Sequence, residues 1–574
     1  MVAGGIEEPG SSNIGASHHP IVISNGKQTK NILLDMGSRP SNTFDKSVEN
    51  PLIDIDINNL DATFISHVHQ DHVGSLIRLT KAGYRGPIYM SDVSKKLCRV
   101  IFDDMLKHEK EDVAEHNRKV RNLQEELSEA RFIVRLHMQA PETRKMKNPH
   151  AKISERFFSI KHLFDNRIDD MMRKYNVKRN KFDKMIKETL YNRKHDVQTT
   201  SNVLRQVNRD NSFDEEEIVR DFAALKKEMI HAAENFTNLQ YDHAKEKLAK
   251  HHIKEKEDIM ALDRRLAIME FNDNDVMQAL GQIKSLTLGK AQDIFDGLLK
   301  VTFYNAGHVE GSVQTVLTVY NGKESVNFMF TGDLGRSKQP SMCGAPEIPK
   351  EELAYVMMEG TYAGRVHNDR MAERAKMIDD INHCKSVTLM PCFALQRFQE
   401  IICFLVEAAH SGKLKLGKGE KIYCHSPLAT ALSKEYIAND PKGTYGALTD
   451  HDILHWIEEQ EEVELLMQQP GRRIIVCSGG MLEKGTITQY IDQINEDKLA
   501  KIILTGFQVP GTNGYKILHG DFKDPVYLNN KTISSNNAQI STYVFSGHAD
   551  HEELKSQFLS LNLSDEATLS VVHG

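Results

Sequence analysis

Four residues of metal-ligand type lie close together in the stretch T-F-I-S-H-V-H-Q-D-H-V-G-S, between Thr63 and Ser75. An apolar, strand-like segment precedes them, so the first two histidines, two positions apart on extended backbone, are expected to point the same way. The chain is then expected to turn into a helix from about Val73. Imidazole and carboxylate are good zinc ligands, and this spacing can serve two adjacent ions. A polar loop of surface histidines is the alternative, but H-x-H-x-D-H favours a metal site made by His67, His69, Asp71 and His72.

Two further residues of ligand type follow predicted strands later in the chain. The stretch L-K-V-T-F-Y-N-A-G-H is expected to be a strand ending at Asn305, with His308 just beyond it. The stretch V-N-F-M-F-T-G-D places Asp333 in the same way after another apolar strand. Either residue by itself is more often part of a turn than a ligand.

Taken in order, H-x-H-x-D-H, His308 and Asp333 resemble the metal motifs of the metallo-β-lactamase superfamily. Members of that superfamily hold one or two metals between the two sheets of an αβ/βα sandwich, so the resemblance implies this α/β fold. It also implies that Asp35, in N-I-L-L-D-M-G, supports the metal loop from behind. A plain turn role for an aspartate before Gly37 stays open.

A second set of motifs resembles the β-CASP branch of the superfamily, which processes nucleic acids. The segment E-G-T-Y, from Glu359, is similar to that branch's E-S-T-Y-G signature, with Gly360 in place of the serine. Further on, V-F-S-G-H-A-D-H and S-V-V-H-G supply His548 and His573. The intervening segments M-P-C-F-A-L-Q-R, I-V-C-S-G-G-M and I-I-L-T-G-F-Q are similar to strands and turns of an inserted α/β β-CASP domain. The chain stops at Gly574, where relatives continue, so a truncated last part is expected.

The resemblance also implies roles for the site residues. It implies two Zn²⁺ ions, the first on His67, His69 and His308, the second on Asp71, His72 and His573, with Asp333 bridging them. Two such ions about 3.5–4 Å apart can share a hydroxide for in-line attack on phosphorus. Asp71 is therefore counted with the catalytic residues as well. His548 corresponds to the general acid, and Glu359 is expected to orient it through a hydrogen bond.

The composition is that of a large soluble protein. A chain of 574 residues is too long for a single core and predicts two or three domains. The net charge of -7 means that any nucleic-acid-binding basic surface must be local. Seven cysteines without a C-x-x-C pair are typical of reduced thiols in the cytosol. With no signal-peptide pattern and no long apolar run, we expect a cytoplasmic protein without membrane association.

The part from Asp104 to Phe271 is polar and helix-forming, and its apolar residues recur at the 3,4 spacing of heptad seams. Two helices leaving and re-entering one domain predict an antiparallel coiled-coil arm; helices packed on the globular body are the alternative. We expect the first two seams to bury one another. The seams are Val113, His116, Val120, Leu123, Leu127, Ala130 and Val134; Ile218, Phe222, Leu225, Met229, Ala232, Phe236 and Leu239; and Ile259, Leu262, Leu266 and Met269.

The middle of this arm, residues 131–209, is basic, with 20 Lys and Arg against 8 Asp and Glu. Aromatic residues are interleaved with these charges, and we expect them to form a small core rather than to stack on bases. The charge indicates a large acidic target, which could be structured RNA, a ribosome or an acidic protein. Homodimerisation through the arm is the competing account.

The predicted organisation follows from these boundaries. Residues 1–103, 273–363 and 546–574 form the metallo-β-lactamase domain, 104–272 the helical arm with its basic tip at 131–209, and 364–545 the β-CASP domain. The predicted function is zinc-dependent hydrolysis of single-stranded or structured RNA, because His573 stands where DNA-repair members of the branch carry valine. A DNA nuclease, a hydrolase of small phosphodiesters or esters, and a non-enzymatic docking scaffold that uses the arm are the alternatives.

Overall fold

The structure is a computed structural model, and it divides the chain into two compact units, Met1–His108 with Glu270–Gly574, and Glu109–Met269. The residues that it describes are 3–6, 14–38, 55–139, 156, 160–175, 178–180, 215–235, 238–254, 256–338, 341–440, 443–522, 526–528, 531–533, 535–543 and 545–572.

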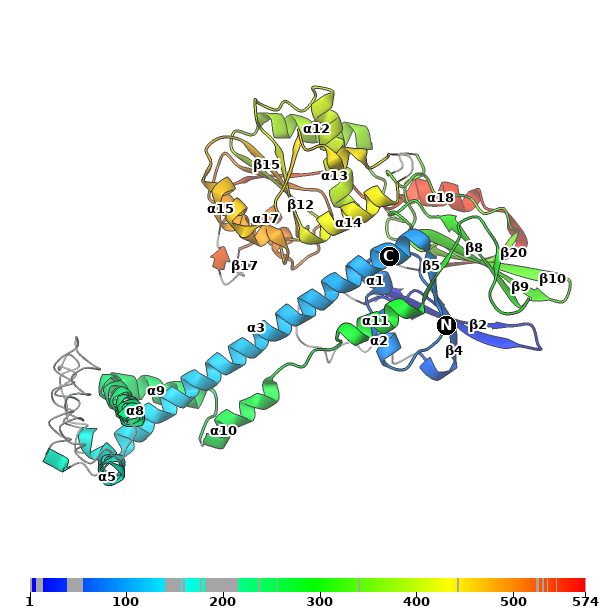
Figure 1. Cartoon of the computed structure of the whole chain (residues 1–574). Helices are drawn as coiled ribbons and strands as arrows, with labels where there is room; N and C mark the ends of the chain where they lie inside the picture. The colour runs from blue at the N-terminus through cyan, green and yellow to red at the C-terminus, as the bar shows by residue number, and fades with distance from the viewer. Residues whose placement is uncertain are drawn as a thin grey trace. The chain divides into compact units, whose positions relative to one another are not determined.

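The first unit contains two six-stranded sheets that face each other (Figure 1). In spatial order the first sheet is β1 (Ala3–Ile6), β2 (Ile14–Ser24), β3 (Thr29–Leu34), β4 (Leu60–Phe64), β5 (Ile88–Ser91) and β6 (Ile283–Leu286). The second is β20 (Leu563–Val572), β11 (Leu353–Glu359), β10 (Glu324–Phe330), β9 (Val313–Asn321), β8 (Leu299–Asn305) and β7 (Gln292–Asp293). Strands β3 to β6 are parallel, whereas β7 to β10 form an antiparallel meander.

Alternate residues of the strands make the core between these sheets, since successive side chains of a strand point to opposite faces. Ile32 and Leu34 of β3 belong to one buried cluster with Val301 and Phe303 of β8. Helices lie outside: α2 (Leu76–Lys81) packs with α11 (Asp273–Gln282), and α18 (His551–Leu559) covers the second sheet through residues such as Leu554. This sandwich confirms the predicted α/β fold class.

A third sheet, also of six strands, is entirely parallel. Its order is β14 (Leu454–Trp456), β13 (Ile422–His425), β15 (Arg473–Ser478), β12 (Val387–Cys392), β16 (Lys501–Leu504) and β19 (Gln539–Thr542). Its helices include α12 (Arg370–His383), α13 (Arg397–His410), α14 (Pro427–Ala438), α15 (Gln460–Gln468) and α17 (Asn513–His519). The central strands read as unbroken apolar runs because both of their faces are buried. Parallel pairing brings the carboxyl ends of all six strands to one edge. The boundaries at residues 364 and 545 stay a prediction.

The segment predicted as a helical arm, 104–272, starts within one long helix, α3, which runs from Asp92 to Gln139. Its 48 residues span roughly 70 Å at 1.5 Å per residue. Three shorter helices follow later in the chain, α8 (Glu215–Glu234), α9 (Asn238–Lys250) and α10 (Lys256–Met260), and a 3₁₀ turn, η4 (Ala261–Arg265), comes next. The third predicted seam, 259–269, is therefore divided between α10, η4 and a segment that is not helical.

The apolar seam of α3 is buried, and its partners include helices outside the predicted second seam. Within the second unit Val120, Leu127 and Ile133 share one core with Leu248 of α9 and Ile259 of α10. The helix α8 also contacts α3, where His231 stacks on Phe132 and lies 3.8 Å from Glu129. It lies along α5 (Asp165–Lys174) as well, with ion pairs Lys174–Glu217 and Arg167–Glu228. The predicted mutual burial of 113–134 and 218–239 stays a prediction. Heptad spacing predicts which face of a helix is apolar, whereas the helix that packs on this face depends on where the chain turns.

Two aromatic residues of the basic tip are buried as expected, Phe164 and Tyr175. Most of the tip, including Phe157, Phe158, Phe182 and Tyr191, lies outside the described residues. Among the helices that the structure does describe, none is both long and apolar enough to cross a membrane.

Candidate metal centre

The predicted ligands sit on loops at strand ends in both facing sheets, after β4 of the first sheet and after β8 and β10 of the second. The loop after β4 carries His67 and His69, and the one-turn helix α1 (Gln70–Val73) that follows carries Asp71 and His72. This helix starts at Gln70, earlier than the predicted start near Val73, because the chain turns directly after His69. His308 follows β8, and Asp333 follows β10.

Four of these side chains converge, although up to 266 residues separate them in sequence. Each of His67, His69, His308 and Asp333 offers one ligand atom, and those four atoms lie within 4.8 Å of one another. His69 Nδ1 is 2.9 Å from His67 Nε2 and 3.3 Å from His308 Nε2. Asp333 Oδ2 is 3.6 Å from the Nε2 atoms of both His67 and His308. Three imidazole nitrogens and a carboxylate oxygen form a donor set typical of zinc sites.

The second oxygen of Asp333 faces a second group. Asp333 Oδ1 lies 3.4 Å from His72 Nε2, which in turn is 3.9 Å from Asp71 Oδ2. The two oxygens of one carboxylate are thus directed at different histidines, an arrangement that fits a bridge between two cations. The remaining predicted ligand, His573, lies outside the described residues.

The protonation of the histidines suits metal binding. Burial lowers the pKa of His69 to about 4, although Asp71 and Asp333 oppose the shift. Burial likewise holds the pKa of His67 and of His308 well below the usual value. These imidazoles are therefore neutral at pH 7 and can donate lone pairs. For His72 burial also lowers the pKa, but Asp333, Asp35 and Asp71 outweigh it and raise the pKa well above 6.5. A metal at His72 would therefore displace a proton.

Behind the ligands, the buried carboxylate of Asp35 fixes their orientation. It accepts hydrogen bonds from the Ser66 backbone N–H at 2.7 Å, from Ser66 Oγ at 2.9 Å and from His72 Nδ1 at 2.7 Å. Because His72 donates through Nδ1, its Nε2 faces Asp333 and Asp71, and loss of the Nε2 proton would leave a lone pair for a metal ion there. Asp35 has a positive φ of 59°, a strained conformation for a non-glycine residue. Of the two roles left open for Asp35, these contacts favour support of the metal loop.

The Ser66 hydroxyl is a functional group that the sequence did not reveal. It donates to Asp35 and lies 3.1 Å from His67 Nδ1, so it can accept the His67 N–H and leave Nε2 directed at the site. A serine directly before H-x-H looks like an ordinary strand-end residue. Only its position opposite Asp35 gives it this role.

His548 and Glu359 meet as predicted. His548 Nδ1 is 3.2 Å from Glu359 Oε1, and its Nε2 is 3.8 Å from Asp333 Oδ2. Glu359 also accepts the backbone N–H of Leu334, which follows Asp333. Burial lowers the pKa of His548, but the charges of Glu359 and Asp333 outweigh it and raise the pKa to about 9. The imidazole is therefore protonated at neutral pH and can donate a proton.

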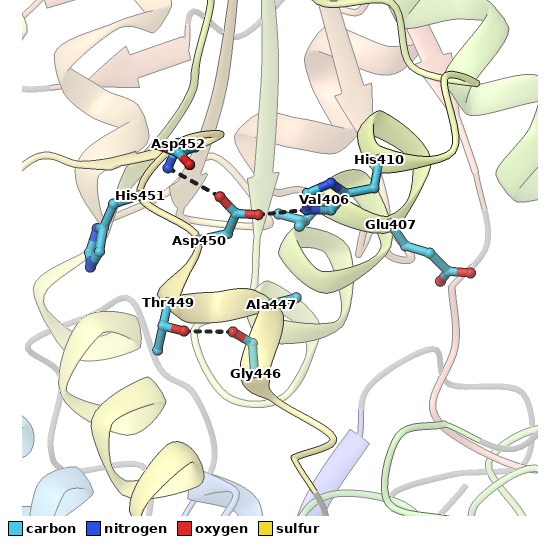
Figure 2. A pocket seen from close by; sticks show the side chains of 9 residues that line it. All are labelled: Val406, Glu407, His410, Gly446, Ala447, Thr449, Asp450, His451 and Asp452. Carbon is cyan, nitrogen blue, oxygen red and sulfur yellow. Dashed lines mark hydrogen bonds and ion pairs between the residues drawn. The ribbon is translucent and has the colours of Figure 1, made fainter.

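A separate hollow of about 820 Å³ lies on the parallel-sheet part of the first unit (Figure 2). It is lined by Val406, Glu407 and His410 of α13 and by 446–447 and 449–452. Within it His410 Nε2 lies 2.6 Å from Asp450 Oδ2 (Figure 2). No predicted site residue lines it, so the candidate site is the histidine–aspartate cluster.

Comparison with known families agrees with this geometry. Residues 17–141 match the family model described as "Metallo-beta-lactamase superfamily", and residues 398–517 match the one described as "Beta-Casp domain". The chain belongs to the metallo-β-lactamase superfamily with a β-CASP domain, and its class is that of the metal-dependent hydrolases of the β-CASP nuclease type.

Individual relatives are more distant. The chain is similar to an RNase J-like protein of Methanocaldococcus jannaschii (27% identity, covering 53% of this chain and 70% of the relative). It is also similar to the transcription termination factor FttA of the same organism, with 25% identity over 53% of this chain and 49% of the relative. The endoribonuclease ysh1 of Schizosaccharomyces pombe is 27% identical over 53% of this chain and 39% of the relative. The match thus spans half or less of the last two relatives.

The segment after β3 and the helix α1 approach each other closely at Gly37, which gives a direct test of how the ligands are held. A Cβ added at Gly37 would lie 1.7 Å from the carbonyl oxygen of Asp71, so a side chain there must displace the loop that carries Asp71 and His72. We expect Gly37→Ala to lower both the zinc bound per chain, by elemental analysis, and the Tm. Gly281→Ala is the matched control, because Gly281 lies in α11 with open space around it. Full zinc content and an unchanged Tm in Gly37→Ala would contradict this account.

Proposed function

We propose that the protein is a zinc-dependent ribonuclease that hydrolyses phosphodiester bonds of RNA. In this proposal His67, His69 and His308 hold one Zn²⁺, Asp71, His72 and His573 hold the other, and Asp333 bridges them. The observation that carries it is the division of the Asp333 oxygens between His67 and His308, 3.6 Å from Oδ2, and His72, 3.4 Å from Oδ1. A carboxylate that served a single ion would not need histidine ligands beside both of its oxygens.

Bound zinc ions would supply a nucleophile from water near neutral pH and offset charge that develops on the phosphate. The chain's own residues do the rest. His548, protonated and 3.8 Å from Asp333, is positioned to give a proton to the departing oxygen. Glu359 holds the His548 ring through Nδ1, so the Nε2 proton faces the site. The centre of the Tyr362 ring lies 5.9 Å from the centre of the His548 ring.

RNA as the substrate is a narrower inference than nuclease activity. It is supported by relatives whose names denote an RNase J-like protein and an endoribonuclease, and by the histidine at position 573. A DNA nuclease of the same branch is the alternative. A docking scaffold is disfavoured, because a scaffold needs no converging set of neutral imidazoles beside a buried carboxylate.

The acid role of His548 is tested by substitution. We expect His548→Ala to keep its zinc while cleavage of a single-stranded RNA falls by about two to four orders of magnitude, since acid catalysis is lost. His383→Ala, at an exposed histidine of α12, is the control and should cleave like the parent. Parental cleavage by His548→Ala would refute the assignment.

Substrate type is tested by a competition. RNA and DNA single strands of equal length and sequence are incubated together with the zinc-loaded protein, and initial rates are compared. We expect the RNA to be cut faster, because the proposal assigns the chain to the RNA-processing group. Faster cutting of the DNA strand would reverse the choice of substrate.

We further propose that the helical arm is an antiparallel coiled-coil hairpin that recognises a large acidic target, such as structured RNA or a ribosome. The support is the local excess of 20 basic over 8 acidic residues in 131–209. An acidic protein partner and homodimerisation are the alternatives.

The arm proposal predicts a change in salt dependence. Replacing Lys181, Lys184 and Lys187 by Gln should weaken binding to a stem-loop RNA and flatten its salt slope by about 2 to 3, through loss of phosphate contacts. Cleavage of a short unstructured RNA should persist. The control replaces Lys413, Lys415 and Lys418, which are exposed and carry the same charge. An equal loss of binding in the control triple, or loss of short-RNA cleavage, would contradict an arm-specific role.

A further inference from the structure

Two phenylalanine rings are exposed at the carboxyl edge of the parallel sheet. Phe393 directly follows β12, and Phe507 lies three residues beyond β16. They are 45% and 48% exposed. The neighbouring residues of both strands are fully buried, so these two rings are exceptions in an otherwise closed core. Packing within the sheet does not require either ring to face solvent.

The two rings belong to one surface. A Cβ added at Gly506, the residue before Phe507, would lie 3.4 Å from Phe393 Cε2, and one at Gly480 would lie 3.5 Å from the same atom. The Phe393 ring therefore lies against the bare backbone of two neighbouring turns, one of which presents Phe507. Because Gly480 and Gly506 have no side chains, neither residue covers the Phe393 ring, which is exposed.

The segments that carry the two rings contact the segments that carry the candidate metal centre. The Arg365 guanidinium lies 5.6 Å from the centre of the Phe507 ring, and Arg365 follows Glu359 by six residues. Tyr362 of the same segment contacts the His548 ring. On the other side, Gln396, which follows Phe393 by three residues, accepts the backbone N–H of Glu310, two residues after His308. Phe507 thus contacts the segment that follows Glu359, and Phe393 lies in a turn whose Gln396 contacts the loop that carries His308.

Flat aromatic rings with a neighbouring arginine are the surfaces on which unpaired bases stack, and they tolerate every base because each has a π-face. A base pair buried in a duplex offers no free face. We propose that Phe393 and Phe507 stack on unpaired bases of the single strand whose phosphate lies at the metal centre, with Arg365 contacting that strand beside Phe507. This inference rests on the proposed function, and it makes the substrate a single strand at the point of binding.

The test measures binding without cleavage. The zinc-loaded His548→Ala chain is titrated with an oligoadenylate of about 12 nucleotides, within the span of known single-strand sites, carrying one 2-aminopurine. Stacking quenches the 2-aminopurine fluorescence. We expect Phe393→Ala and Phe507→Ala, each added to His548→Ala, to raise the Kd at least about fivefold, the lower end for loss of one stacked base. Leu465→Ala and Leu499→Ala remove exposed apolar side chains elsewhere in the same unit and should leave the Kd unchanged.

A second probe separates stacking from general damage. The same ribose-phosphate oligomer without bases should bind all the variants with one Kd, because it has nothing to stack. A penalty that persists on this oligomer would overturn the inference, and so would Phe→Ala variants whose Kd for oligoadenylate stays within twofold of the His548→Ala chain. Absence of any binding by His548→Ala itself would contradict the proposed function and this inference together. Equal Kd values would contradict the inference alone.

Discussion

The carboxylate of Asp333 is the constraint on which the site depends. It is almost fully buried among His67, His72 and His308, two of which are neutral because burial lowers their pKa. Burying a carboxylate costs free energy unless positive charge or hydrogen bonds compensate. In the metal-free chain part of that compensation comes from protonated His72 and from His548. Metal cations at these positions would compensate the same buried carboxylate. Metal binding should therefore also stabilise the loops that carry the ligands.

Holding these groups in place requires rigid support from behind. Asp35 adopts a strained backbone conformation while its carboxylate joins the Ser66 and His72 side chains. The backbone around it is equally close, since the Met36 N–H donates to the His72 carbonyl at 2.8 Å. Such contacts leave room only for glycine at position 37. Strain at Asp35 persists because the surrounding hydrogen bonds over-determine it, which is common at functional sites.

The parallel-sheet domain is joined to the metal-bearing loops by buried polar groups. Tyr445 Oη donates to Glu310 at 2.8 Å, and Glu400 accepts the backbone N–H of Met342 at 3.3 Å. These bonds join the turn at Tyr445 to the loop that carries His308, and α13 to the segment that follows Asp333. One domain therefore carries the groups of the proposed chemistry, and the other carries the proposed surface for the strand. The helical unit is built differently, with a single seam of α3 buried by several short helices.

The sequence by itself determined the ligand types, their placement at strand ends and the class of fold, because these depend on local patterns. Alternation of apolar residues predicts strands such as β8 and β10, and the residue that follows a strand end is readable without any long-range contact. Tertiary structure decided everything that joins distant segments. His69 and His308 are 239 residues apart, and no local pattern states that their nitrogens lie 3.3 Å from each other. The same holds for Ser66 facing Asp35 and for the partners of the α3 seam, which include α9 and α10. Periodicity identifies the face to be buried, whereas the partner depends on turns and register set by the whole chain.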